Sequence, residues 1–216
     1  MLPTADQVLA QLEALASSAR GAAFIWHVLV LLGLGALWTG RWLPSRRLAG
    51  MFAALPLVSA AVLAAVSGNP FNGAVVGATA ATLLILALRL SLQPVERAPA
   101  LPAAFGVAAV AYALLYPHFV PGGWVFAVLM APVGVLPCPS LALVLGVALL
   151  ARGFGSRAGS LVAAGVAVFY AMFGMFRLGV WLDAGLLAAA VALISFTLLP
   201  RGTLRGWRPG ARFALR

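Results

Sequence analysis

The sequence predicts an all-α polytopic membrane protein, a bundle of about seven transmembrane helices with the N-terminus outside and the C-terminus in the cytoplasm. Of its 216 residues, 64% are apolar and 8% are charged, whereas soluble domains have roughly 45–50% apolar and about 25% charged residues. A soluble fold could not cover so much apolar surface. The apolar residues also form runs of about the 20 residues that a transmembrane helix needs, and the arginines gather on one side of these runs.

Seven apolar runs follow one another, and we expect each to form a transmembrane helix. They are residues 22–40, 48–67, 71–89, 101–120, about 132–151, 159–178 and 181–199. Their separators carry Gly, Pro, Asn or Arg, which favour loops. Because these separators are short, we expect three parts: an amphipathic interfacial helix over 1–20, a transmembrane domain over 21–200 and a basic cytoplasmic tail over 201–216.

The first helix is predicted over residues 4–19. Thr4 and Gln7 have the spacing of a capping box, and the apolar residues that follow lie on one helical face. This face favours a helix at the membrane surface or one packed on the bundle. Asp6 and Glu13 stand where a signal peptide would be basic and apolar, so we expect the first transmembrane helix to act as an uncleaved signal.

The arginines indicate the orientation. All 14 basic residues are Arg, and seven helices place twelve of them on one side, which the positive-inside rule makes cytoplasmic. These twelve are Arg41, Arg46, Arg47, Arg89, Arg97, Arg152, Arg157 and the five of the tail. Arg20 and Arg177 fall on the other side. The net charge of +10 therefore indicates the cytoplasmic loops of a membrane protein, with the lipid bilayer as partner, rather than nucleic-acid binding.

The fifth helix is preceded by a segment broken by Pro and Gly. Five prolines and the pair Gly122-Gly123 lie between Pro117 and Pro139. A continuous helix cannot pass through this spacing, because each Pro removes a backbone donor and disfavours helix in the residue before it. The apolar residues 124–131 are too few to cross a bilayer. We expect a re-entrant segment within residues 121–131, on the outer side and shielded by other helices.

The motif Pro137-Cys138-Pro139-Ser140 is a candidate functional site, about six residues into the predicted fifth helix. Two interpretations stay open. The motif shapes the start of a broken helix, which we favour, or the Cys138 thiol binds a soft metal ion such as Cu(I). Since Cys138 is the single cysteine, a disulfide within the chain is excluded.

His27 and His118 are candidate ligands, because ionisable groups at membrane depth suggest function. His27 follows Trp26 in the predicted first transmembrane helix, with the small Ala23 one turn earlier. It could be an axial ligand of a buried tetrapyrrole or, as we favour, a neutral histidine that packs between helices. His118 lies near the outer end of the fourth predicted transmembrane helix, where we expect a hydrogen bond to loop backbone.

Charged residues are otherwise expected at helix ends. Arg177 and Asp183 flank the turn between the last two predicted helices, where a local ion pair or an extension to the surface explains both. His27 is the one ionisable residue in the middle of a predicted helix, which disfavours proton- or cation-coupled transport. The sequence has no Lys, so a retinal Schiff base is excluded. We find no phosphate-binding loop, carboxylate pair or catalytic triad, and expect no enzyme activity.

Small residues favour close contacts between helices. The second predicted transmembrane helix has Ala60, Ala61, Ala64 and Ala65, and the third has Gly73, Gly77 and Ala81. We expect most of these residues to pack within the chain and some faces to contact a partner protein.

Several motifs resemble those of the bacterial membrane-protein family catalogued as domain of unknown function 6064. They are the polar helix at 4–19, Asn69-Pro70, Tyr116-Pro117, Ala131-Pro132-Val133-Gly134 and Pro137-Cys138-Pro139-Ser140. The chain departs from the family's pattern at Ser140, where the family has Thr, and His118 has no clear counterpart. The family has no established activity, so the resemblance implies a fold and the importance of residues 132–140, but no reaction.

Three functions are open. The leading hypothesis is a non-catalytic accessory or scaffold subunit of a larger membrane complex, with other membrane-protein subunits as partners. The second is a small permease for a metal ion or a neutral solute, with Pro117 to Ser140 as its outer vestibule. The third is a tetrapyrrole-associated subunit with His27 as axial ligand. The sequence does not identify a cofactor.

Overall fold

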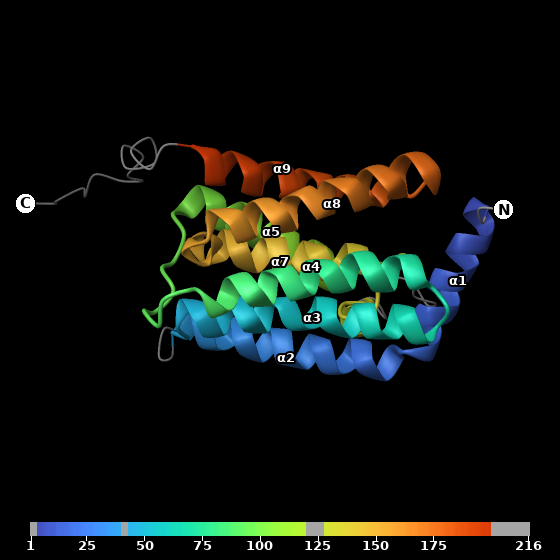
Figure 1. Ribbon diagram of the computed structural model, residues 1–216, viewed down its shortest axis with the longest axis horizontal. Coiled ribbons are helices and arrows are strands. Elements are labelled where there is room, and N and C mark those ends of the chain that lie inside the picture. The colour runs from blue at the N-terminus through green and yellow to red at the C-terminus, as the bar shows by residue number, and fades with distance from the viewer. Residues whose placement is uncertain (1–3, 40–42, 120–127, 200–216) are drawn as a thin grey trace, which may run out of the picture.

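The computed structural model describes residues 4–39, 43–119 and 128–199. Within these ranges the named elements are all helices, and there is no strand (Figure 1). The all-α prediction is therefore confirmed. The α-helices are α1 (Ala5–Ser18), α2 (Arg20–Thr39), α3 (Arg46–Val66), α4 (Pro70–Leu88), α5 (Ala100–Leu114), α7 (Pro137–Leu150), α8 (Arg157–Arg177) and α9 (Ala184–Leu198). Two short 3-10 helices, η1 (Arg152–Gly155) and η2 (Trp181–Asp183), precede α8 and α9.

Several helices are suited to a membrane. In the described part of the chain, α3, α4, α8 and the segment Trp181–Leu198 are each long and apolar enough to cross, and α1 with α2 pass the same test as a pair bent by 69°. The helices α5 and α7 are apolar but shorter. By length, four or five candidate spans are therefore shown rather than seven. Large apolar side chains such as Leu32, Phe52 and Val191 are exposed on the outside, where lipid would cover them.

The N-terminal helix begins and packs as the sequence predicts. Thr4 caps α1, and Gln7 completes the capping box by accepting a hydrogen bond from the Thr4 N–H. Leu15 and Ala16 are buried on one face, against a cluster that includes Leu136. Through this face α1 packs on the bundle, and it lies across one end of the other helices (Figure 1).

Prolines shorten two helices relative to the prediction. α5 ends at Leu114 rather than at residue 120, because Pro117 disfavours helical backbone in the residue before it. α7 begins at Pro137 rather than near residue 132, with Pro137 at a first-turn position where the missing N–H costs nothing. Cys138 therefore lies in the first turn of its helix, not six residues into it. Of the expected re-entrant segment, residues 121–127 lie outside the described residues.

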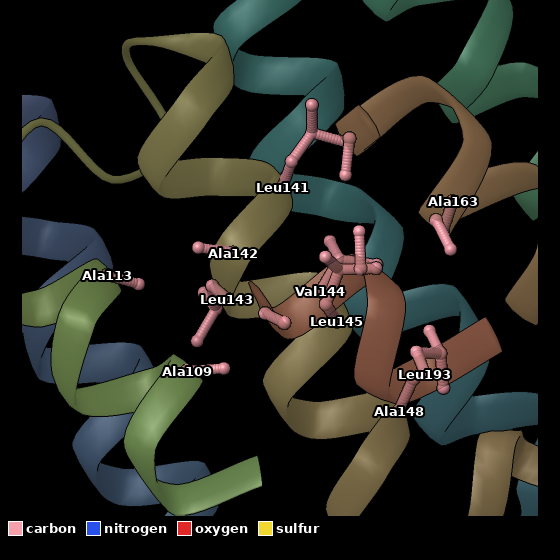
Figure 2. Packing of buried hydrophobic residues seen from close by; sticks show 14 of the residues in the cluster. Ala109, Ala113, Leu141, Ala142, Leu143, Val144, Leu145, Ala148, Ala163 and Leu193 are labelled. Carbon is pink, nitrogen blue, oxygen red and sulfur yellow. The ribbon is translucent and has the colours of Figure 1, made fainter. Parts of the chain in front are cut away.

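α7 forms the centre of the bundle. Eleven of its 14 residues are buried, and it contacts α3, α5, α8 and α9. Figure 2 shows Leu141, Leu145 and Ala148 of α7 in the apolar core, with small residues from α5 and α8 beside them. A helix that is apolar on all sides is typical of such a buried position.

The alanine and glycine residues of α3 and α4 let these helices pack closely. A Cβ built on Gly73 would lie 3.1 Å from the Ala65 Cβ, and one on Gly77 would lie 3.6 Å from the Ala61 Cβ. The predicted packing of these small residues within the chain is therefore confirmed.

The arginine-containing loops lie together at one end of the bundle. The helix ends place Arg46, Arg47, Arg89, Arg97, Arg152 and Arg157 at the end opposite α1 (Figure 1). Arg46 and Arg152 both donate to the carboxylate of Glu96, which joins three loops there. Arg41 and the five arginines of the tail fall outside the described residues. Of the twelve arginines expected on one side, the six that the structure describes do lie at one end. The membrane side that this end faces is not shown.

Candidate ligand-binding site

The segment before α7 is buried backbone without helical structure. Ala131, Val133 and Val135 are fully buried, and Gly134 has a φ of 72° and lies against the Trp26 ring. The Ser140 hydroxyl accepts a hydrogen bond from the Gly134 N–H at 2.9 Å and donates to the Leu136 carbonyl at 2.6 Å. Ser140 thus satisfies polar backbone groups that would otherwise be costly inside the protein. This geometry fits the structural interpretation of the Pro-Cys-Pro-Ser motif.

Asp183 forms the polar centre of the same end of the bundle. It is 2% exposed, and its Oδ1 atom accepts hydrogen bonds from the hydroxyls of Tyr116 at 2.9 Å and Tyr112 at 3.3 Å. The Tyr112 hydroxyl also donates to the Leu182 carbonyl oxygen, at 3.1 Å. The Cys138 thiol donates to Oδ2 at 3.4 Å. Residues from α5, α7 and the start of α9 therefore meet on one carboxylate.

The expectation that Asp183 extends to the surface is wrong. The carboxylate turns inward because Gly174, in the neighbouring turn of α8, leaves room for it: a Cβ on Gly174 would lie 1.9 Å from Oδ2. Asp183 was not among the predicted site residues. The available signal was the pair Tyr112 and Tyr116, four residues apart, which places two hydroxyls on one face of the chain.

A second polar pair lies nearby. The Tyr170 hydroxyl on α8 donates to the Asn72 Oδ1 atom on α4 at 3.0 Å. Asn72 is 9% exposed and Tyr170 is 5% exposed. Neither residue was singled out from the sequence, because a single Asn in an apolar run carries no local sign of a partner 98 residues away.

These polar groups line a cavity of about 480 Å³. Asp183, Cys138, Tyr116, Tyr170 and Asn72 all contribute to its wall. Residues of α1, among them Val8 and Leu12, form another side. Pockets that hold small organic molecules have volumes of about 300–1,000 Å³ and a few polar groups in an apolar wall. The cavity has both properties.

His27 is placed as a packing residue. Its side chain is 1% exposed, with Nδ1 2.9 Å from the Ala23 carbonyl oxygen and Nε2 3.2 Å from the Leu114 carbonyl oxygen. Both ring nitrogens face backbone oxygens, so neither is directed at space for a metal centre. This geometry gives no support to the axial-ligand hypothesis and favours the helix-packing alternative.

His118 follows the end of α5 and is outside the cavity wall. Its ring packs edge-on against Phe119, with centroids 4.1 Å apart. Partial burial lowers the pKa of His118, and the Glu13 carboxylate on α1 opposes this effect. His118 therefore lies where α1 meets the bundle, and the structure does not bring it together with His27 or Cys138.

The donor set does not suit a metal ion. Cys138 and Asp183 are adjacent, but no group of three or more His, Cys, Asp or Glu side chains within residues 4–39, 43–119 and 128–199 could hold one. A soft metal ion would need more strong ligands than Cys138 and Asp183 supply. The metal-ion form of the permease hypothesis therefore has no support from the geometry.

Comparison of the chain with protein-family models, with curated proteins and with solved structures gives no match. The resemblance to the family of domain of unknown function 6064 accordingly stays an expectation, and the function must be argued from the residues of the cavity.

Proposed function

We propose that the chain is a non-catalytic, multi-pass membrane protein that binds a small organic molecule in the cavity beside α1. The observation that supports this most strongly is a cavity of about 480 Å³ with a buried carboxylate in its wall. An ionisable group inside an apolar bundle is costly and points to function. Six of the lining residues lie between Tyr116 and Pro139, a segment that overlaps the vestibule of the solute-permease hypothesis.

Binding is better supported than passage through the chain. Beyond the cavity, the middle of the bundle is filled by fully buried residues such as Leu141, Ala142 and Leu145 (Figure 2). Close packing of these described core residues favours binding in the cavity over passage through the bundle. The role of accessory subunit stays a prediction, as do its protein partners.

We further propose that α2, α3, α4, α5, α7, α8 and α9 all cross the bilayer. They run side by side along the long axis (Figure 1). α7 has 14 residues, about 21 Å at 1.5 Å per residue, against a hydrocarbon core of about 30 Å. Because other helices surround α7, it need not match the lipid thickness. Six of the described arginines lie at one end and favour a cytoplasmic location for that end, in a bacterial inner membrane.

The topology predicts how tags at the two ends will behave. In intact spheroplasts, a tag before Met1 should be accessible to antibody, and a tag after Arg216 should become accessible only after permeabilisation. An accessible C-terminal tag in intact spheroplasts would show that the orientation is reversed. Tags on the same side would show an even number of spans.

The cavity itself can be tested with a blocking variant. Val8 lines the cavity and Ala10, on the same helix, does not. We expect at least one compound from a panel of small organic cations, anions and neutral molecules to raise the unfolding temperature of the purified full chain, because a ligand that binds the native state stabilises it. Val8→Trp should abolish this shift by filling the cavity, and the control Ala10→Trp should keep it.

Two results would count against the binding function. The first is a panel that contains no stabilising compound for the unaltered chain. The second is a stabilising compound whose effect is the same in Val8→Trp, because it would then bind elsewhere.

A further inference from the structure

The two oxygens of the Asp183 carboxylate are unequally satisfied. Oδ1 accepts from the hydroxyls of Tyr116 and Tyr112. Oδ2 accepts from the Cys138 thiol at 3.4 Å, and a thiol is a weak donor. A carboxylate has about four acceptor sites, so Oδ2 retains capacity for a strong donor.

Oδ2 contacts two residues that line the cavity. It is flanked by Cys138 and by Gly174, where the missing Cβ leaves the space that Oδ2 occupies. Both of these residues line the cavity, as does Asp183 itself. A buried acceptor with unused capacity at the wall of a cavity suits a ligand that donates to it.

Aromatic rings form much of the remaining wall. They come from α4, from the loop that follows α5 and from α8, and they are Phe71, Tyr116, Phe119, Tyr170 and Phe173. The faces of aromatic rings attract cations, and rings around a cavity are a known means of holding organic ammonium groups. Arg177 also lines the cavity, but its side chain is exposed, whereas Asp183 is 2% exposed.

Building on the proposed binding function, we infer that the ligand is an organic ammonium compound. Its positive nitrogen lies against Oδ2 of Asp183, and its apolar part lies among the aromatic rings. A charged N–H donor supplies the hydrogen bond that the thiol makes only weakly. The same positive charge is stabilised by the carboxylate, which has little water around it to screen it.

Three probes of one shape test the charge of the ligand. Benzylammonium, benzyl alcohol and benzoate differ mainly in being positive, neutral and negative at pH 7. Titration calorimetry on the full chain in lipid nanodiscs should show benzylammonium binding at least about tenfold more tightly than either of the others. Empty nanodiscs give the correction for partitioning into lipid.

The variants then locate the charge. Asp183→Asn removes the negative charge at similar size, and it should weaken benzylammonium binding about tenfold or more while changing benzyl alcohol binding less than about twofold. Glu96→Gln makes the same change at the opposite end of the bundle and should leave all three affinities as they are. Cys138→Ser offers Oδ2 a stronger donor, so it should weaken benzylammonium binding even if Asp183→Asn does not fold.

The outcomes separate the inference from the proposed function. Tightest binding of benzoate, equal binding of all three probes or equal affinity in Cys138→Ser would overturn the ammonium ligand. So would a stabilising compound from the panel that is not a cation and is blocked by Val8→Trp, although the binding function would then stand. If no compound binds at all, both fail.

Discussion

Replacing Gly134 by Ala is expected to destabilise the bundle by roughly 2–5 kcal/mol, since left-handed backbone costs about 1–2 kcal/mol and overpacking a further 1–3 kcal/mol. Gly134 has a φ of 72°, and a Cβ there would lie 2.0 Å from the Trp26 Cδ1 atom. The Trp26 ring is held in α2, so either this ring or the buried segment before α7 must move. Thermal unfolding of the purified protein in detergent, followed by circular dichroism, measures the loss.

Gly179→Ala is the matched control for this variant. Gly179 also has a φ of 72°, but no heavy atom lies within 4 Å of a Cβ built on it. The control therefore carries the backbone strain without the contact with Trp26, and the difference between the two variants isolates that contact. Equal losses would show that the contact does not constrain the segment.

The order of the helices could be predicted from the sequence because each apolar run is long and separated by residues that favour loops. The errors lie where local rules compete. Pro117 shortens α5, and the start of α7 moves to Pro137 because the preceding residues form buried turns instead of helix. Ser140 and Trp26 contact this loop, and its dependence on such tertiary contacts has no periodic signature.

The candidate site was predicted in part. Cys138 was singled out for its place between two prolines, and it does line the cavity. Its partner Asp183 was assigned to an exposed turn, because the sequence near it gives no sign of the space beside Gly174 or of the hydroxyl of Tyr116, 67 residues away. Burial of a polar group depends on which distant residues satisfy it, and a single sequence does not show this.

Gly146→Ala should destabilise the centre of the bundle by about 1–3 kcal/mol, the usual cost of overpacking. A Cβ on Gly146 would lie 2.7 Å from the Val110 Cγ2 atom and 2.9 Å from both the Gly106 carbonyl oxygen and the Val110 nitrogen. Two of these three atoms belong to backbone and cannot turn aside, so α5 and α7 would have to separate. Thermal unfolding in detergent measures the effect.

Gly77→Ala tests whether this cost comes from the contact or from changing a helical glycine. The nearest atom to a Cβ on Gly77 is the Ala61 Cβ at 3.6 Å, which is an ordinary van der Waals distance. Alanine favours helix over glycine by about 1 kcal/mol, so Gly77→Ala should be neutral or stabilising. If the α5–α7 contact sets the cost, the free energy of unfolding should fall in Gly146→Ala and stay the same or rise in Gly77→Ala. A Gly146→Ala protein as stable as the parent would contradict this explanation. Because α7 touches α3, α8 and α9 as well as α5, its displacement would also disturb the wall that Cys138 gives to the cavity.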